Sequence, residues 1–226
     1  MKEQNYLMVD LGLPSGIKWA DKNIAADTPQ DKGMYFSWGN VDGHVVDENN
    51  NTTYNYSFDK DTYATTSGGQ YTGSILDAEH DAATVNMGSD WRMPTSAEIL
   101  ELIQETDHYY IDDNGNTITG PFNYENKIPK KEFDGYKKLR SVCFVKNGEA
   151  FNYNDRSNFI EFPFVGICSG SLLDVEYFYG YIWSNSVLDS ATEYARNLIL
   201  ISDGRIYGDN CYRFFGTFCS WCYFKH

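Results

Sequence analysis

Apolar runs of strand length make up most of the hydrophobic pattern along the chain. Residues 9–20 predict two short strands joined by a Pro-Gly turn, and residues 34–39 predict another short strand. Asn114-Gly115 predicts a tight hairpin turn between strands at residues 109–111 and 117–119. Further runs of strand type follow at residues 141–145, 159–164, 180–184, 197–201 and 205–207.

Two stretches have helical spacing. Residues 76–87 predict a helix that is capped by Asp77 and stopped by Gly88. The expected apolar face of this helix consists of Ala82, Ala83 and Val85. A second helix is predicted after Thr95, because Thr95 and Glu98 have the spacing of a capping box. The apolar residues that follow at helical spacing are Ile99, Leu100, Leu102 and Ile103.

The order of these elements predicts the fold class. Two early helices followed by many short strands are typical of an α+β domain with a largely antiparallel, twisted sheet. Residues 40–73 have almost no aliphatic periodicity and predict a long surface loop. No Pro/Ser linker divides the 226 residues, so one domain spanning residues 1–226 is expected.

Net charge restricts the partners of the protein. A formal charge of −14 argues against binding to nucleic acid or to anionic membranes, which requires a basic surface. No stretch approaches 18 apolar residues, and residues 1–6 are not followed by the apolar core of a signal peptide. We therefore expect neither membrane insertion nor an export signal, and a partner that is a protein or a carbohydrate.

Residues 187–220, called the 187–220 segment below, have an unusual composition. Lys, Glu, Gln, Met and Trp supply 35 of the first 186 residues, so about six are expected among these 34, but Glu193 is the only one. An Asn codon mutated only at its adenines cannot give any of these five residue types. The composition therefore suggests a hypervariable face on a fixed scaffold. The alternative is an aromatic-rich pair of strands whose composition is due to chance.

Aromatic side chains are concentrated in the same part of the chain. The last 50 residues hold 14 of the 37 aromatic rings. Rigid aromatic rings mixed with small polar residues are typical of antibody binding surfaces. The candidate ligand-binding residues are Tyr207, Asp209, Asn210, Tyr212, Phe214, Phe215 and Phe218. Strand alternation would separate Tyr212 and Phe214 from Cys211, Arg213 and Phe215, so about half of this region is expected in the core.

Several motifs together resemble a known family. They are Val9-Asp10-Leu11-Gly12-Leu13-Pro14-Ser15-Gly16, Tyr35-Phe36-Ser37-Trp38-Gly39, Trp91-Arg92-Met93-Pro94-Thr95 and Ile182-Trp183-Ser184-Asn185-Ser186. The chain resembles variable proteins of diversity-generating retroelements, which have a C-type-lectin-like fold and are encoded by gut Bacteroidetes or their phages. The resemblance covers residues 9 to about 216. The closing residues depart from it, because the family usually ends in a Ser-Val-Arg-Pro-Val-like strand.

The resemblance implies both a mechanism of variation and a function. In that family a reverse transcriptase copies an adenine-mutated template into the 3′ end of the gene. Residues 1–186 would then form the scaffold, and the 187–220 segment would contain the ligand-binding face. Ala195, Leu198, Arg213 and Gly216 would belong to its sparse framework. The expected protein is a receptor or adhesin on a phage tail or a cell surface, with a protein or carbohydrate ligand.

Other motifs in the chain carry weaker signals for metal binding or catalysis. Cys211, Cys219, Cys222 and His226 have a spacing that could supply a Cys3His zinc site. Cys168 lies in a Gly-x-Cys-x-Gly motif that imitates a nucleophile elbow. Residues 112–116, and Asp42 with Asp47 and Glu48, could be taken for calcium loops. We expect no catalytic residue, metal or cofactor.

Two alternative functions stay open from the sequence. A relative of the formylglycine-generating oxidases would need a reactive cysteine pair, for which Cys219 and Cys222 are the candidates. An undiversified structural protein of the surface is the other alternative.

Overall fold

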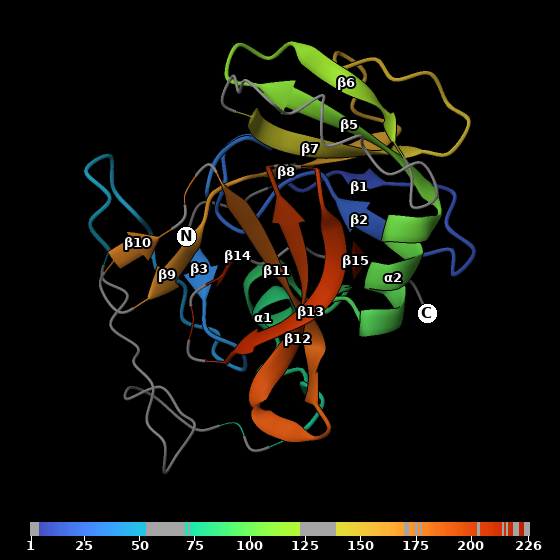
Figure 1. Cartoon of the computed structure of the whole chain (residues 1–226). Coiled ribbons are helices and arrows are strands. Elements are labelled where there is room, and N and C mark those ends of the chain that lie inside the picture. Colours follow the sequence, from blue (N-terminus) through green and yellow to red (C-terminus); the bar gives the residue numbers. More distant parts are fainter. Residues whose placement is uncertain are drawn as a thin grey trace.

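The structure of the protein, a computed structural model, describes residues 5–52, 71, 73–122, 139–169, 172–174, 176, 178–202, 204–213, 215, 217–218 and 222–223. Within these residues it contains two helices and several sheets whose strands pair antiparallel with one exception. The prediction of an α+β protein with mainly antiparallel pairing is therefore confirmed. Figure 1 shows one sheet above a second sheet of long strands, with a helix beside the latter.

One small sheet joins the beginning of the chain to its last described strand. β1 (Met8–Val9) pairs with β2 (Lys18–Ala20), as residues 9–20 predict, and Gly16 adopts the positive φ of 74° that their turn requires. The sheet continues through β15 (Cys222–Tyr223) to β4 (Trp91–Arg92). The last strand is thus held between two strands from the first half of the chain.

The first helix is shorter than its predicted range. α1 spans Ala82–Met87, and its N-cap is Asp81, whose Oδ1 accepts hydrogen bonds from the N–H groups of Ala83 and Thr84. The predicted start at residue 76 with Asp77 as the cap is wrong, because the Asp77 carboxylate accepts the N–H groups of a separate turn that precedes the helix. Val85 is 49 % exposed, so it does not belong to the buried face.

The second helix begins as its sequence predicts. α2 spans Ser96–Gln104, and its capping box is complete, because the side chains of Thr95 and Glu98 each accept the other residue's backbone N–H. Glu98 also pairs with the guanidinium of Arg92. Ile99, Leu102 and Ile103 are buried, whereas Leu100 is 48 % exposed, so one residue of the expected apolar face points away from the core.

A four-stranded sheet follows α2, in the order β6-β5-β7-β8. Its strands are β5 (Thr106–Asp112), β6 (Thr117–Phe122), β7 (Leu139–Lys146) and β8 (Phe159–Pro163). Gly115, at a φ of 80°, forms the predicted turn of the β5–β6 hairpin. Figure 1 shows this sheet at the top of the molecule.

A buried carboxylate ties the outer strand of this sheet to its surroundings. Glu161 of β8 accepts hydrogen bonds from Ser141, Arg156, Gln30 and Tyr153. Burial acts to raise the pKa of Glu161, but these hydrogen bonds together hold it below its ordinary value. The carboxylate is therefore a structural anion with its acceptor capacity filled.

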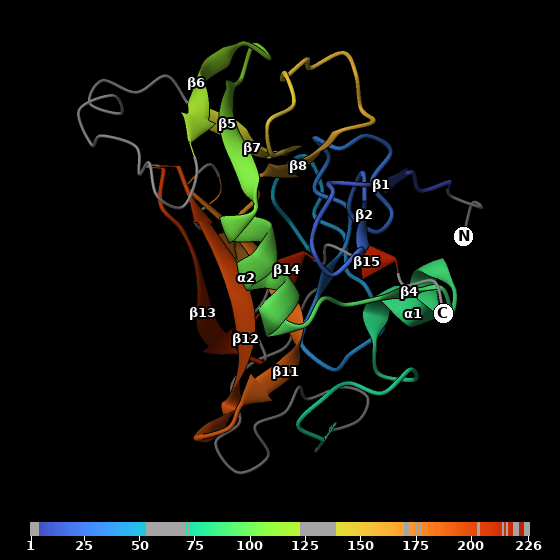
Figure 2. The same ribbon diagram turned by 90° about the vertical axis from the view of Figure 1, so that its right-hand side faces the viewer.

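The longest strands form a five-stranded sheet in the order β13-β12-β11-β14-β3. They are β11 (Tyr179–Leu188), β12 (Ala191–Ile201), β13 (Ile206–Tyr212), β14 (Thr217–Phe218) and β3 (Tyr35–Phe36). β11, β12 and β13 contain most or all of the predicted runs at residues 180–184, 197–201 and 205–207 and extend beyond them, whereas β3 covers only Tyr35 and Phe36 of the run at residues 34–39. Figure 2 shows β13 at the outer edge of the sheet.

Two further strands, like β4, were not predicted. β9 (Ile167–Ser169) and β10 (Leu172–Asp174) form a separate pair. Cys168 lies in β9 and is fully buried, and this burial raises the pKa of its thiol to about 12. A thiol so rarely ionised is a poor nucleophile, so the structure speaks against a nucleophile elbow at this position.

The core lies between α2 and the long strands. Ile99, Leu102 and Ile103 of α2 belong to one apolar cluster with Leu198 and Leu200 of β12. A second cluster contains Trp38, Trp183 and Ala195. Figure 2 shows α2 lying along β12. The helix therefore covers the strands that carry most of the 187–220 segment.

Candidate ligand-binding site

The 187–220 segment supplies both core and surface. Ala195 and Leu198 of β12, two of the residues expected to form the framework, are fully buried. Tyr194 and Arg196, their neighbours along the strand, are only partly buried. On the adjacent strand β13, residues 207–209 are exposed and residues 210–212 are partly exposed. The surface part of the segment is thus formed by two neighbouring strands.

The structure places most of the candidate ligand-binding residues on β13. Tyr207 is 36 % exposed, Asp209 is exposed, and Asn210 and Tyr212 are partly exposed. Phe215 follows the strand and is half-buried. Four of the seven candidates therefore lie along one edge strand.

The two remaining candidates are not placed as surface side chains. Phe214 lies outside the described residues. The backbone of Phe218 lies in β14, where it pairs with Ile182 of β11 and with Tyr35 of β3. Its side chain is outside the described part of the structure.

At the end of β13, alternate residues point to different environments. Cys211 packs against the second apolar cluster, and the Arg213 guanidinium lies 4.5 Å from the centre of the Trp38 ring. Tyr212 instead stacks on Tyr194 of β12, with ring centres 4.3 Å apart. Tyr212 is separated from Cys211 and Arg213, as strand alternation predicts. Phe215, which the same alternation would place with Cys211 and Arg213, instead lies beyond the end of β13 and contacts Tyr212.

An aromatic row runs across this end of the sheet. Tyr194 stacks on Tyr212, which in turn meets Phe215 edge to face at 6.1 Å. A hydrogen bond with Tyr212 is the main reason that the pKa of Tyr194 is raised to about 12. Sequence reasoning missed Tyr194, although it lies in the 187–220 segment. Its signal is the pairing of β12 with β13, which places Tyr194 directly opposite Tyr212.

A hollow of about 150 Å³ lies between α2 and the two strands. We call it the α2–β13 hollow. Its helix wall consists of Ser96, Ile99 and Leu100. Its strand wall consists of Arg196, Asn197, Gly208, Asp209 and Asn210. Only Asp209 and Asn210 of this lining were predicted as site residues. The helix residues could not be predicted, because the helix comes to the site through tertiary packing alone.

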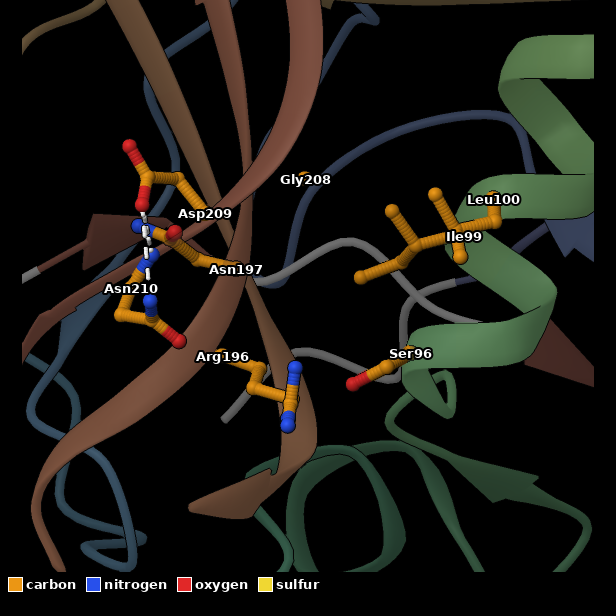
Figure 3. A pocket seen from close by; sticks show the side chains of 8 residues that line it. All are labelled: Ser96, Ile99, Leu100, Arg196, Asn197, Gly208, Asp209 and Asn210. Carbon is orange, nitrogen blue, oxygen red and sulfur yellow. Dashed lines mark hydrogen bonds between the residues drawn. The ribbon is translucent and has the colours of Figure 1, made fainter. Parts of the chain in front are cut away.

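The polar groups of the hollow fall into two sets (Figure 3). Asp209 Oδ1 accepts hydrogen bonds from the backbone N–H of Asn210 at 2.9 Å and from its amide at 3.4 Å. Arg196 extends from β12 toward Ser96 at the start of α2. Within the described part of the chain, the side chain of Arg196 makes neither a hydrogen bond nor an ion pair. The hollow therefore combines a satisfied carboxylate with an uncompensated cation.

Asn197 is a polar residue in a buried position. It is 1 % exposed, and neither Oδ1 nor Nδ2 has a hydrogen-bond partner among the described residues. Leaving a buried amide unpaired costs about 1–3 kcal/mol. Its neighbours across the strands are Trp183 and Asp209.

The positions considered for metals contain groups with other roles. Asp47 Oδ1 accepts the N–H groups of Asn49 and Asn51, and Asp112 does the same for its hairpin turn. Burial raises the pKa of Cys211 to about 12, and Cys219 and His226 lie outside the described residues. Among the residues that the structure describes, no three His, Cys, Asp or Glu side chains are grouped to hold a metal ion.

Comparison of the chain with protein-family models, with curated proteins and with solved structures finds no match. In the described ranges, neither helix is long and apolar enough to cross a membrane. The chemistry of this site therefore has to be argued from its own residues.

Proposed function

We propose that the protein is a non-enzymatic ligand-binding module, a receptor or an adhesin. Residues 1–186 would be a C-type-lectin-like scaffold, and the 187–220 segment would be diversified by adenine-directed retroelement mutagenesis. The ligand would be a protein or a carbohydrate on a cell or phage surface, and the module itself would belong to a phage tail or a cell surface.

The observation that carries this proposal is how the 187–220 segment is divided. Its aliphatic residues Ala195, Leu198 and Leu200 are fully buried. Tyr207 and Asp209, two of its aromatic and small polar residues, are exposed. A surface that changes from copy to copy is tolerated only where such changes do not disturb packing. This division supports a variable face on a fixed frame.

The buried amide of Asn197 supports the same proposal independently. Selection for stability would favour an apolar residue at a site that is 1 % exposed and offers no hydrogen-bond partner among the described residues. Asn is the residue from which adenine-directed changes start. An unpaired buried Asn is therefore the trace expected of a copying process that does not depend on packing.

The arrangement of the strands is compatible with the proposed scaffold. β15 lies between β2 and β4, so strands from both ends of the described chain share one sheet. The two helices and the long strands β11 and β12 fit an α+β scaffold of this kind. These features support the C-type-lectin-like fold without depending on the composition of residues 187–220.

Sequencing of the DNA around the gene tests the proposal directly. We expect a template repeat that differs from the codons of residues 187–220 almost only where the template has adenine, together with a reverse-transcriptase gene. Sibling copies should differ at positions 194, 196, 197, 207, 209, 210 and 212 and should agree at positions 195 and 198. The absence of a repeat and of a reverse transcriptase, or free use of Lys, Glu and Met at these positions, would refute the proposal.

A further inference from the structure

We propose that the α2–β13 hollow receives the carboxylate of a glutamate side chain from an extended protein segment that pairs with the open edge of β13. This inference deepens the proposed ligand-binding function and rests on it. It adds the chemical class of the ligand and the groups that hold it.

The first observation concerns Arg196, the cation of the hollow, whose guanidinium has no partner among the described residues. Arg92 and Arg156 each pair with a glutamate, and Arg213 lies over the Trp38 ring. Arg196 differs, because no carboxylate and no ring in the described part of the chain meets its guanidinium. A guanidinium presents its N–H groups in a planar fork that matches a carboxylate. Such a guanidinium favours an acidic group on the ligand.

The apolar side of the hollow is the second step. Leu100 is 48 % exposed and Ile99 is buried beneath it, so the helix wall offers apolar surface beside the cation. Gly208 has no side chain, and a Cβ placed there would lie 3.8 Å from Leu100 Cδ2. The volume of about 150 Å³ suits one side chain. The two methylenes of a glutamate would lie on Leu100 while its carboxylate reaches Arg196.

The edge of β13 is the third step. Ile201 donates its N–H to the carbonyl of Arg205, and Arg213 donates its N–H to that of Glu193. Because antiparallel bonds alternate, the odd-numbered residues of β13 face β12, and Gly208 presents its N–H and carbonyl to the open edge. No described strand lies on that side of β13.

This geometry favours an extended peptide over a sugar. Main-chain hydrogen bonds at an open edge hold an added strand, and adjacent pockets select its side chains. Gly208 supplies the edge and also lines the hollow, so one segment can use both. Asp209 already accepts the outward N–H of Asn210, so pairing would be centred on Gly208.

The test is a titration of the ¹⁵N-labelled full chain, followed by NMR. The probes are N-acetylglutamate N′-methylamide, its glutamine counterpart and glucuronate. We expect the glutamate probe to shift the Gly208 amide and the Arg196 Nε–H signals, and the other two to leave them unchanged. Arg196→Gln should weaken binding of the glutamate probe at least about ten-fold, since it removes charge-assisted hydrogen bonds. Arg205→Gln, with the same change of charge on an exposed side chain, should bind like the parent.

A second variant covers the case in which Arg196→Gln does not fold. Leu100→Glu changes an exposed residue and places a carboxylate inside the hollow, so it should block the probe. The inference is overturned if both amino-acid probes act alike, if neither shifts these signals, or if Leu100→Glu binds as the parent does. Binding of glucuronate alone would overturn the peptide ligand in favour of an acidic sugar. If the titration fails but a template repeat lies beside the gene, the proposed function stands and only the glutamate ligand is refuted. If the titration succeeds but no repeat is found, the glutamate site stands and the proposed diversification is refuted.

Discussion

Replacing Asn197 by valine should stabilise the protein. The change removes two buried polar atoms that have no hydrogen-bond partner among the described residues and puts a β-branched side chain into the middle of β12. An unpaired buried amide costs about 1–3 kcal/mol, so we expect Asn197→Val to raise the free energy of unfolding by about 2 kcal/mol. For a chain of this length, that corresponds to an increase in melting temperature of about 4–8 °C.

The assay is urea unfolding followed by tryptophan fluorescence, with a thermal melt as the second measurement. Asn86 provides a matched control, because its amide donates to the carbonyls of Val41 and Ala82 at 3.1 and 2.9 Å. Asn86→Val makes the same chemical change at a satisfied position and should lower stability by about 1–2 kcal/mol.

Comparing Asn197→Val with Asn86→Val tests whether the buried amide of Asn197 destabilises the protein. Opposite signs for Asn197→Val and Asn86→Val would show that residue 197 is a misfit in the core. A loss of more than about 1 kcal/mol in Asn197→Val would refute the reasoning, since it would mean that the amide is satisfied in solution. Residue 197 would then give no support to the proposed retroelement copying.

Three further predictions concern the scaffold. His108 is buried and its pKa is lowered to about 4, so between pH 6.5 and 4 the unfolded chain binds more protons than the folded chain. Acidification through this range should therefore lower the free energy of unfolding by about 3 kcal/mol. His108→Phe should remove this loss when urea unfolding is compared at pH 7 and pH 4.5. Thr95→Ala removes the N-cap of α2 and should lower stability by about 1 kcal/mol in the same assay, whereas Thr28→Ala, in a surface turn, should change it by less than about 0.5 kcal/mol. Burial raises the pKa values of the Cys143 and Cys168 thiols, so mass spectrometry after iodoacetamide treatment should find both unlabelled in the folded protein and labelled in urea. If either thiol in the folded protein reacts as fast as an exposed thiol, its buried placement is contradicted.

Short sequence motifs predicted those elements whose geometry depends only on residues close together in the chain. The Thr95–Glu98 capping box satisfies two amides within one turn, so α2 could be placed from four residues. Asn114-Gly115 predicted its hairpin for the same reason. The start of α1 failed because Asp77 and Asp81 are equally good caps locally. Only the burial of Asp81 and its bond to the Met93 amide distinguish them.

The site could be predicted only in part because it is assembled from distant elements. The composition of residues 187–220 predicted Tyr207, Asp209, Asn210 and Tyr212, which lie together on β13. It could not predict Leu100, because the packing of α2 against β13 is absent from any local pattern. Nor could it distinguish Asn197, which is buried, from Asn210, which is partly exposed, since both are asparagines on adjacent strands.

The position of β15 has a consequence for how the protein is made. Cys222 lies opposite Trp19 and Arg92, so this sheet joins residues up to about 200 positions apart, and contacts of such separation form slowly. During translation, the sheet that contains β2 and β4 cannot form completely until β15 is made, and β15 leaves the ribosome only after residues 187–220. A copy whose β12 and β13 cannot form would also fail to deliver β15 to its neighbours, and the unfinished chain would be open to proteases. If residues 187–220 are diversified as proposed, only those copies whose β12 and β13 fold and place β15 between β2 and β4 would persist.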